Sequence, residues 1–133
     1  MSQAVLTNRE LCDRIMAAYG PHGIDELLGY LDPEVEWATT EQWMEREVWV
    51  GHAQVRAGLE RFFAAWTHFS NELLEFRDGG DRFAVVSRMS GVAPTSGISA
   101  EMLAAGVIYV RDGVIVRVVG HSDPRRAMQE IAG

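Results

Sequence analysis

Apolar residues at helical spacing characterise the first part of the chain. Leu11, Ile15 and Ala18 follow residues 7–10, whose Thr-Asn-Arg-Glu order has the form of a capping box. Gly20-Pro21 ends this stretch. The pattern therefore predicts a first helix between the capping box and Gly20.

Two further apolar sets predict two more helices with a short strand between them. The second set is Ile24, Leu27, Leu28 and Leu31, and the third is Val55, Leu59, Phe62, Phe63 and Trp66. Asp32-Pro33 ends the second helix and leads into a strand over residues 34–38, whereas Gly51 precedes the third helix. Residues 39–50 have no clear period, so we expect a long connection there.

The period changes to two after His68, which predicts a run of strands. Their expected ranges are residues 71–77, 82–92, 101–111 and 114–121. Asp112-Gly113 is typical of a type I′ hairpin turn, and Asp123-Pro124 opens a final helix. Helices followed by antiparallel hairpins indicate an α+β fold, with the helices packed on a curved antiparallel sheet. We expect a single domain over residues 1–133.

Composition excludes several classes of function. The 133 residues are 47% hydrophobic, which supports a packed core, and the net charge of −7 disfavours a nucleic-acid partner. All twelve basic residues are arginines, which indicates a GC-rich bacterial source and excludes lysine chemistry. With a single cysteine, no signal-peptide pattern and no apolar run of about 20 residues, we expect a cytoplasmic protein that does not contact membranes.

The order of these elements resembles the SnoaL-like branch of the nuclear transport factor 2 (NTF2-like) superfamily. The similarity rests on the Asp-Pro-Glu-Val-Glu-Trp segment at residues 32–37, on Gly51 before an aromatic helix, and on residues 111–117 followed by Asp123 and Ala127-Met128. The resemblance implies a cone-shaped α+β barrel with a hydrophobic pocket in its mouth, often in a homodimer. It does not imply one function, because members include polyketide cyclases, ketosteroid isomerases, epoxide hydrolases, dehydratases and noncatalytic binders.

The resemblance places no carboxylate at the family's catalytic positions. The base, the tyrosine and the neutral acid of ketosteroid isomerases fall on Trp37, Ile15 and Ala105 or Gly106. The Arg-x-Asp pair and the last-strand Asp of limonene-type epoxide hydrolases fall on Arg88-Met89-Ser90 and Gly120. Of the charged groups in both mechanisms, only Arg88 is present.

Arg88 is the first candidate catalytic residue. Strand alternation groups it with Ala84, Val86 and Ser90, and places Phe83, Val85, Ser87 and Met89 on the other face. If the Arg88 face lines the pocket, the guanidinium is an electrophile that polarises a carbonyl or binds a carboxylate. Alternatively, Arg88 pairs with an acid such as Glu101 across the sheet.

His121 is the second candidate, as a general acid or base. Alternation directs it away from the face of Val116, Val118 and Gly120, which favours a surface histidine, an interface histidine or a cap of the last helix. Glutamates 36, 41, 45 and 47 form an acidic rim that is either solvated or supplies a base. No histidine pair has metal-site spacing and Cys12 is expected in the core, so we expect no metal and no cofactor.

Aromatic residues supply most of the predicted pocket wall. The expected ligand contacts are Trp37, Trp43, Phe62, Trp66, Ser90 and Gly120. Trp43 lies on the irregular connection, where an aromatic lid and a dimer contact are both open interpretations. Phe83, Val85 and Met89 on the opposite sheet face predict a homodimer through the sheet.

Two functions from different classes follow. One is a cofactor-independent cyclase, isomerase or lyase acting on an apolar carbonyl compound, with Arg88 polarising the carbonyl and His121 or a rim glutamate moving the proton. The other is a noncatalytic binder of a small apolar or aromatic molecule, or a dimeric accessory domain. The missing carboxylates favour the binder, whereas Arg88 and the aromatic wall favour the enzyme.

Overall fold

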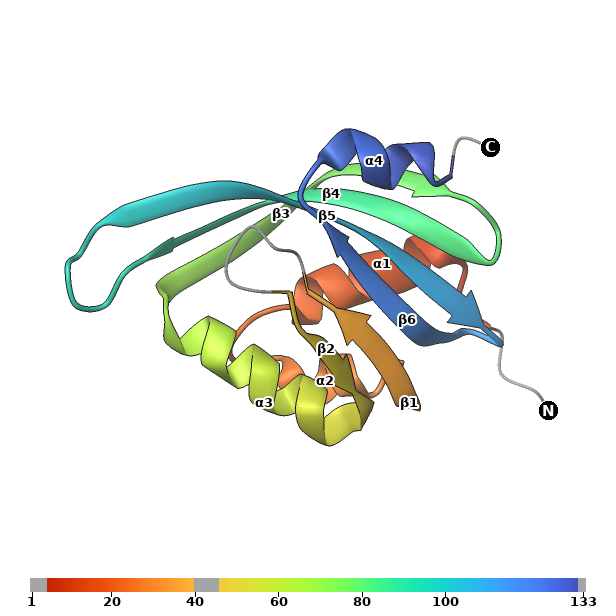
Figure 1. Ribbon diagram of the computed structural model, residues 1–133, viewed down its shortest axis with the longest axis horizontal. Helices are drawn as coiled ribbons and strands as arrows, with labels where there is room; N and C mark the ends of the chain where they lie inside the picture. The colour runs from red at the N-terminus through yellow and green to blue at the C-terminus, as the bar shows by residue number, and fades with distance from the viewer. Residues whose placement is uncertain (1–4, 40–45, 132–133) are drawn as a thin grey trace.

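In the part of the chain that the structure describes, six strands form one curved sheet and four helices lie on its two sides (Figure 1). The computed structural model describes residues 5–39 and 46–131. The elements are α1 (Asn8–Ala18), α2 (Ile24–Leu28), β1 (Leu31–Ala38), β2 (Val48–Val50), α3 (Gly51–Ala64), β3 (Thr67–Asp78), β4 (Arg82–Val92), β5 (Ser99–Arg111), β6 (Val114–His121) and α4 (Pro124–Gln129). None of the helices in these residues is long and apolar enough to cross a membrane.

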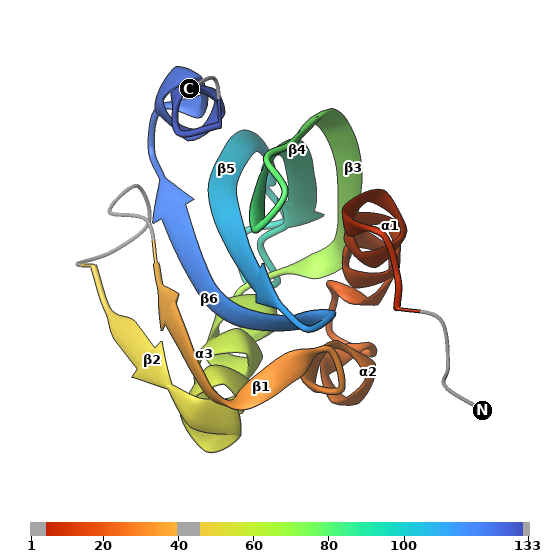
Figure 2. The ribbon, with the colours of Figure 1, turned by 90° about the vertical axis from the view of Figure 1, so that its right-hand side faces the viewer.

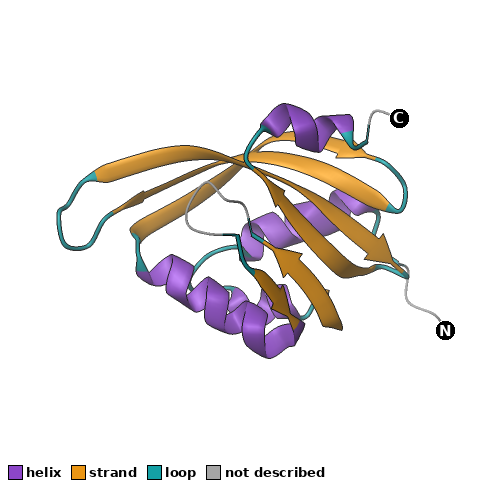
Figure 3. Cartoon of the chain, in the orientation of Figure 1, coloured by secondary structure: helices purple, strands orange, loops and turns teal. Residues whose placement is uncertain are grey.

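The six strands are ordered β2-β1-β6-β5-β4-β3 in a single sheet. Neighbouring strands are antiparallel except β1 and β6, which run parallel. The sheet curves without closing, and the expected α+β fold with helices packed on a curved sheet is confirmed (Figure 2). Helices α1, α2 and α3 cover its concave side, and α4 lies on the convex side (Figure 3).

Local signals in the sequence produce the expected helix ends and turns. The Thr7 hydroxyl accepts a hydrogen bond from the Glu10 amide at 3.1 Å, and the Glu10 carboxylate accepts one from the Thr7 amide at 2.9 Å. Asp112 and Gly113 have φ values of 54° and 77°, as a type I′ turn requires. The Asp123 carboxylate caps α4 at the Arg125 amide, with Pro124 in the first helical position.

The boundary between α2 and β1 differs from the prediction. Helix α2 ends at Leu28, and β1 already begins at Leu31 and includes Asp32-Pro33. The register between β1 and β6 shifts between Leu31 and Glu36, which accommodates a proline that cannot donate to a ladder. The expected connection over residues 39–50 also contains strand β2, whose three residues are too few to show an alternation.

Two apolar clusters lie on the two faces of the sheet. The concave cluster includes Leu11, Leu59 and Phe83 and contains most of the core. The convex cluster joins Ala84, Val86 and Val107 of the sheet to Ala127 and Met128 of α4. Strand β4 is therefore apolar on both faces where α4 covers it.

The predicted faces of β4 are reversed. Phe83 and Met89 are buried on the concave side, at 0% and 6% exposure. Val85 also packs against the concave cluster. These three residues therefore face the core, and the sequence argument for a dimer through them is wrong.

Candidate functional site

A cavity of about 170 Å³ lies between α1, α3 and the concave face of the sheet. Its walls are mainly apolar, from Ile15 and Met16 of α1, Leu59 and Phe62 of α3, and Val85 and Met89 of β4, together with Ala104, Gly106 and Ile108 of β5 and Val118 and Gly120 of β6. None of the described residues that line it is charged. The cavity therefore suits an uncharged, largely apolar molecule.

Aromatic rings form the end of the cavity nearest β1 and β2. The Tyr19 and Trp37 rings stack with their centres 6.4 Å apart, and the centres of Trp37 and Trp49 are 6.1 Å apart. Trp49 packs directly on Gly58 of α3, where a Cβ atom would lie 2.3 Å from the indole ring. Gly58 is thus the residue that allows the indole to form this wall.

Polar groups are few, and two of them have no partner. Trp49 Nε1 and Asn71 Oδ1 are buried side-chain atoms without a hydrogen bond among the described residues. Asn71 Nδ2 donates to the Met16 sulfur at 3.7 Å, which places the amide nitrogen rather than its oxygen next to that acceptor. Both unsatisfied groups belong to residues that line the cavity, and buried polar atoms of this kind usually have a partner.

Tyr19, Ser87, Thr39 and the indole nitrogen of Trp37 supply the other polar side-chain groups of the wall. Burial raises the pKa of the Tyr19 hydroxyl well above its usual range. Tyr19 therefore stays protonated at neutral pH and is a hydrogen-bond donor. Such donors and acceptors can form hydrogen bonds with a carbonyl or hydroxyl group of a ligand.

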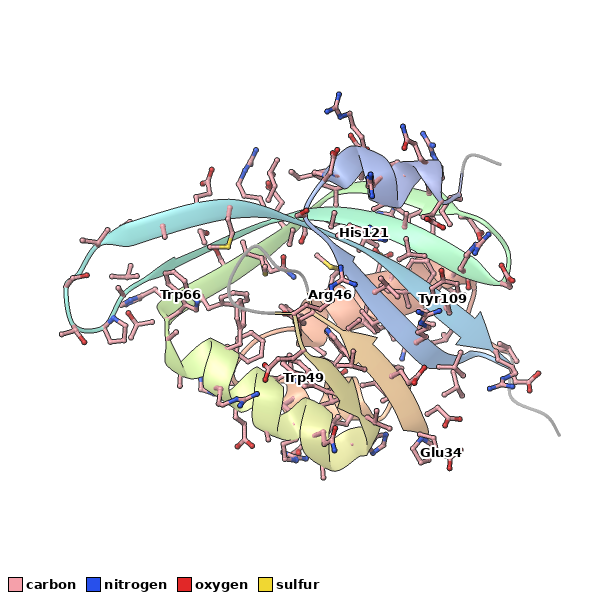
Figure 4. The ribbon with its side chains drawn as sticks, viewed as in Figure 1. Glu34, Arg46, Trp49, Trp66, Tyr109 and His121 are labelled. Carbon is pink, nitrogen blue, oxygen red and sulfur yellow. The ribbon has the colours of Figure 1, made fainter. Side chains whose placement is uncertain are left out.

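Three of the six expected ligand contacts line the cavity, namely Trp37, Phe62 and Gly120. Trp66 and Ser90 do not, because they border a second, smaller recess farther along β4. Trp66 lies just beyond α3, away from Trp49 (Figure 4). Trp43 lies outside the described residues.

Arg88 lies on the opposite face of the sheet from the cavity. Its Nη1 is 3.0 Å from Glu72 Oε1, and its Nε is 3.4 Å from Glu101 Oε1. The side chain is exposed, and it is absent from the cavity wall formed by its neighbours Ser87 and Met89. The prediction that Arg88 faces the pocket is wrong, and its pairing with Glu101 is the alternative that the structure bears out. Such an exposed ion pair contributes little to stability.

His121 likewise points away from the cavity, although the preceding Gly120 lines it. It lies at the end of β6 beneath α4, and burial lowers its pKa (Figure 4). Glu130 opposes this shift, while Arg46 and Arg126 add to it. A role as general acid or base in the cavity is therefore not supported, in agreement with the strand alternation.

The low pKa of His121 predicts how stability changes with pH. Because the pKa of His121 is lower in the folded state, the unfolded chain binds the proton more readily than the folded chain as the pH falls below the ordinary value of 6.5. The contribution of neutral His121 to the free energy of unfolding is therefore complete above that pH and is lost as the pH falls through the folded-state pKa. We expect His121→Gln to flatten the pH dependence of the free energy of unfolding just below pH 6.5, measured by urea denaturation. Exposed His22→Gln is the control, and equal slopes in the two variants would contradict this assignment.

Other candidate groups carry no chemistry in the cavity. Cys12 is fully buried, and burial raises the pKa of its thiol to about 11, which disfavours a thiolate nucleophile. Of the acidic rim, Glu36 and Glu47 are described and do not line the cavity, whereas Glu41 and Glu45 lie outside the described residues. In residues 5–39 and 46–131, no three His, Cys, Asp or Glu side chains are grouped to hold a metal ion.

Sequence comparison assigns the family. The SnoaL-like domain matches residues 12–118, which is most of the chain. The chain belongs to the SnoaL-like domain family. The resemblance inferred from the sequence is thus confirmed, while no curated protein matches the chain significantly.

Solved structures share the fold of this SnoaL-like domain at low identity. TerC, co-crystallised with polyporic acid, is 22% identical, with a TM-score of 0.73 over 93% of this chain and 96% of TerC. A candidate polyketide cyclase from Xanthomonas campestris pv. campestris is 22% identical, with a TM-score of 0.67 over 92% of each chain. A hypothetical protein with a ketosteroid isomerase-like fold from Catenulispora acidiphila DSM 44928, in complex with trimethylamine, is 12% identical, with a TM-score of 0.76 over 95% of each chain.

Sequence reasoning missed Tyr19, Asn71 and Ser87. Tyr19 is one helical turn beyond Ile15, the position that the resemblance assigns to the isomerase tyrosine, and both residues line the cavity. Asn71 and Ser87 reach the cavity from β3 and β4, where Asn71 pairs with Met89. Their signal is a polar residue on an otherwise apolar strand face, which becomes visible only when that face is known to be the inner one.

Proposed function

We propose that this SnoaL-like domain binds a small, uncharged, largely apolar molecule in the cavity between α1, α3 and the sheet. The observation that carries the proposal is the composition of the wall, where apolar side chains surround a few neutral polar groups. A cavity of about 150 Å³ lined by apolar side chains accommodates benzene, so about 170 Å³ suits a molecule built on one ring.

The unpartnered polar atoms support a ligand with one polar group. Trp49 Nε1 is a donor without a partner among the described residues and the Tyr19 hydroxyl is a second donor in the wall, so a ligand carbonyl would supply a matching acceptor. A carboxylate fits less well, because it would be desolvated without a cation among the described wall residues. The proposed class is therefore a one-ring compound with a carbonyl or hydroxyl group.

Catalysis as a cyclase, isomerase or lyase is the second candidate. The neutral Tyr19 hydroxyl favours it, because a donor in an apolar cavity stabilises a developing oxyanion. Against it, the described wall has no carboxylate or histidine to move a proton, and Arg88 lies on the other face. Binding without turnover is thus the better supported function.

Isothermal titration with acetophenone and benzoate tests the binding proposal. We expect saturable binding of one acetophenone per chain, with benzoate at least about tenfold weaker because its charge is not compensated. The two probes have the same ring and differ in the charge of the polar group. Binding of benzoate as tightly as acetophenone, or no binding of acetophenone, would contradict the proposal.

Cytoplasmic location and a homodimer stay predictions. The residues first expected at a dimer interface face the core, but the convex face of β3 and β5 exposes Leu74 and Leu103 at 39% and 45%. Sedimentation of the intact protein measures the oligomeric state directly.

A further inference from the structure

We propose that Met89 sets the length of the ligand by separating the main cavity from a second apolar recess. The inference rests on the proposed function and concerns the same site. Met89 and Phe62 are the residues that border both spaces. Between them they form a partition across the concave face of the sheet.

The recess continues the inner face of β4 and β5 toward the end of their hairpin. Gly91 and Met89 contribute from β4, and their partners Ala100 and Met102 contribute from β5. Trp66 and Phe69 close the other side. The recess has a volume of about 10 Å³, which is too small to hold a ring of a ligand by itself. A ligand could enter it only if the recess were joined to the main cavity.

Gly91 fixes the position of Trp66 over the recess. A Cβ atom at residue 91 would lie 3.1 Å from the Trp66 Cβ and 3.3 Å from Cε3 of its ring. The indole therefore lies directly against the strand. Trp66 is thus the end wall of the extended space, which gives this predicted ligand contact a role only for longer ligands.

Phe62 is the fixed half of the partition. Its ring centre is 5.4 Å from that of Phe63, 6.1 Å from Phe69 and 6.5 Å from Tyr19. Moving Phe62 would disturb all of these contacts. The ring therefore belongs to the packed core between α1, α3 and β3.

Met89 is the adjustable half. It is buried at 6% exposure, but its unbranched thioether side chain can change rotamer at lower cost than a ring held on several sides. A ligand of one ring fits in the main cavity with Met89 in place. A ligand with a second ring in line requires that the Met89 side chain leave the partition.

The test compares acetophenone with 4-phenylacetophenone, which adds one ring to the same carbonyl compound. In the unsubstituted protein we expect the longer probe to bind more weakly. Met89→Ala is expected to raise the affinity for the longer probe relative to acetophenone by at least about tenfold. Met89→Val is the second variant, because it shortens the side chain while it suits a strand.

Met16→Ala is the matched control. Met16 borders the main cavity only, so its truncation enlarges that cavity without opening the recess. We expect it to change the affinity ratio by less than about threefold. An equal change in Met16→Ala and Met89→Ala would overturn the inference, as would equal binding of both probes to the unsubstituted protein.

A crystal structure of Met89→Ala without ligand separates this inference from the proposed function. Failure of acetophenone to bind the unsubstituted protein would contradict the function, yet the cavity in the variant still tests the partition. One continuous space from Val85 to Trp66 is the expected result. Movement of Phe62 into the vacated space would overturn it.

Discussion

Replacing Gly58 by alanine is expected to lower the free energy of unfolding by about 2 kcal/mol, although alanine is the better helix former. The new Cβ atom would lie 2.3 Å from Cε2 and Cζ2 of Trp49, far inside van der Waals contact. Trp49 lies on β2 and is 8% exposed, and moving its ring toward the cavity would disturb its contact with Trp37, whose ring centre is 6.1 Å away. The steric cost therefore exceeds the gain of about 1 kcal/mol in helix propensity.

The Trp49→Leu background supplies the control for Gly58→Ala. With the indole removed, the alanine should no longer clash and should be neutral or stabilising by up to about 1 kcal/mol. Urea denaturation of the four proteins gives the coupling energy between the two positions. The same destabilisation in both backgrounds would show that Trp49 is not the cause.

Replacing Ala104 by phenylalanine is expected to weaken acetophenone binding by at least about 100-fold. Ala104 lies on β5 opposite Ser87 and lines the cavity, so a phenyl group there would occupy the space of a one-ring ligand. The added ring also fills a void, so the fold should tolerate it better than an insertion into a packed core. Titration calorimetry and thermal unfolding measure the two effects separately.

Leu103→Phe is the matched control for Ala104→Phe. Leu103 is the preceding residue on the same strand, but it is 45% exposed on the convex face. The same ring introduced there should leave the affinity for acetophenone unchanged within about twofold. Loss of binding in Leu103→Phe with retention in Ala104→Phe would place the ligand on the convex face of the sheet and contradict the proposal.

Features specified by neighbouring residues could be predicted from the sequence. The capping box at Thr7 and Glu10, the Asp112-Gly113 turn and the Asp123 cap depend on hydrogen bonds or backbone angles within a few residues. Strand β2 could not be predicted because it has three residues and depends on pairing with β1. The sequence therefore predicts elements that depend on neighbouring residues, but not a short strand that depends on pairing with another strand.

The sequence pattern assigns the inner and outer faces of β4 the wrong way round, and this error misplaces the candidate site. Alternation separates Val85 from Val86, but both are apolar because α4 covers the convex face at Val86. The clue was the apolar pair Ala127-Met128 in the last helix, which needs an apolar surface to cover. With the faces exchanged, Arg88 leaves the cavity and Met89 enters it.

Register decides the rest of the site. Asn71 reaches the cavity because it pairs with Met89 across β3 and β4, and β3 shifts register twice along its length. Such irregularities depend on contacts between strands and cannot be recognised from the alternation of residues in β3 or β4 alone. Tyr19 was within reach of sequence reasoning, since it is the C-cap residue of α1, four residues after Ile15, and both residues line the cavity.

The location of bound acetophenone tests the central claim most directly. Nuclear Overhauser effects between its ring protons and protein methyl groups report which side chains lie next to the ligand. The binding proposal predicts effects to the methyl groups of Met16, Val85 and Val118 in the cavity wall, and none to exposed Leu103 and Ile98. Effects confined to Leu103 or Ile98, with none to the wall residues, would contradict it.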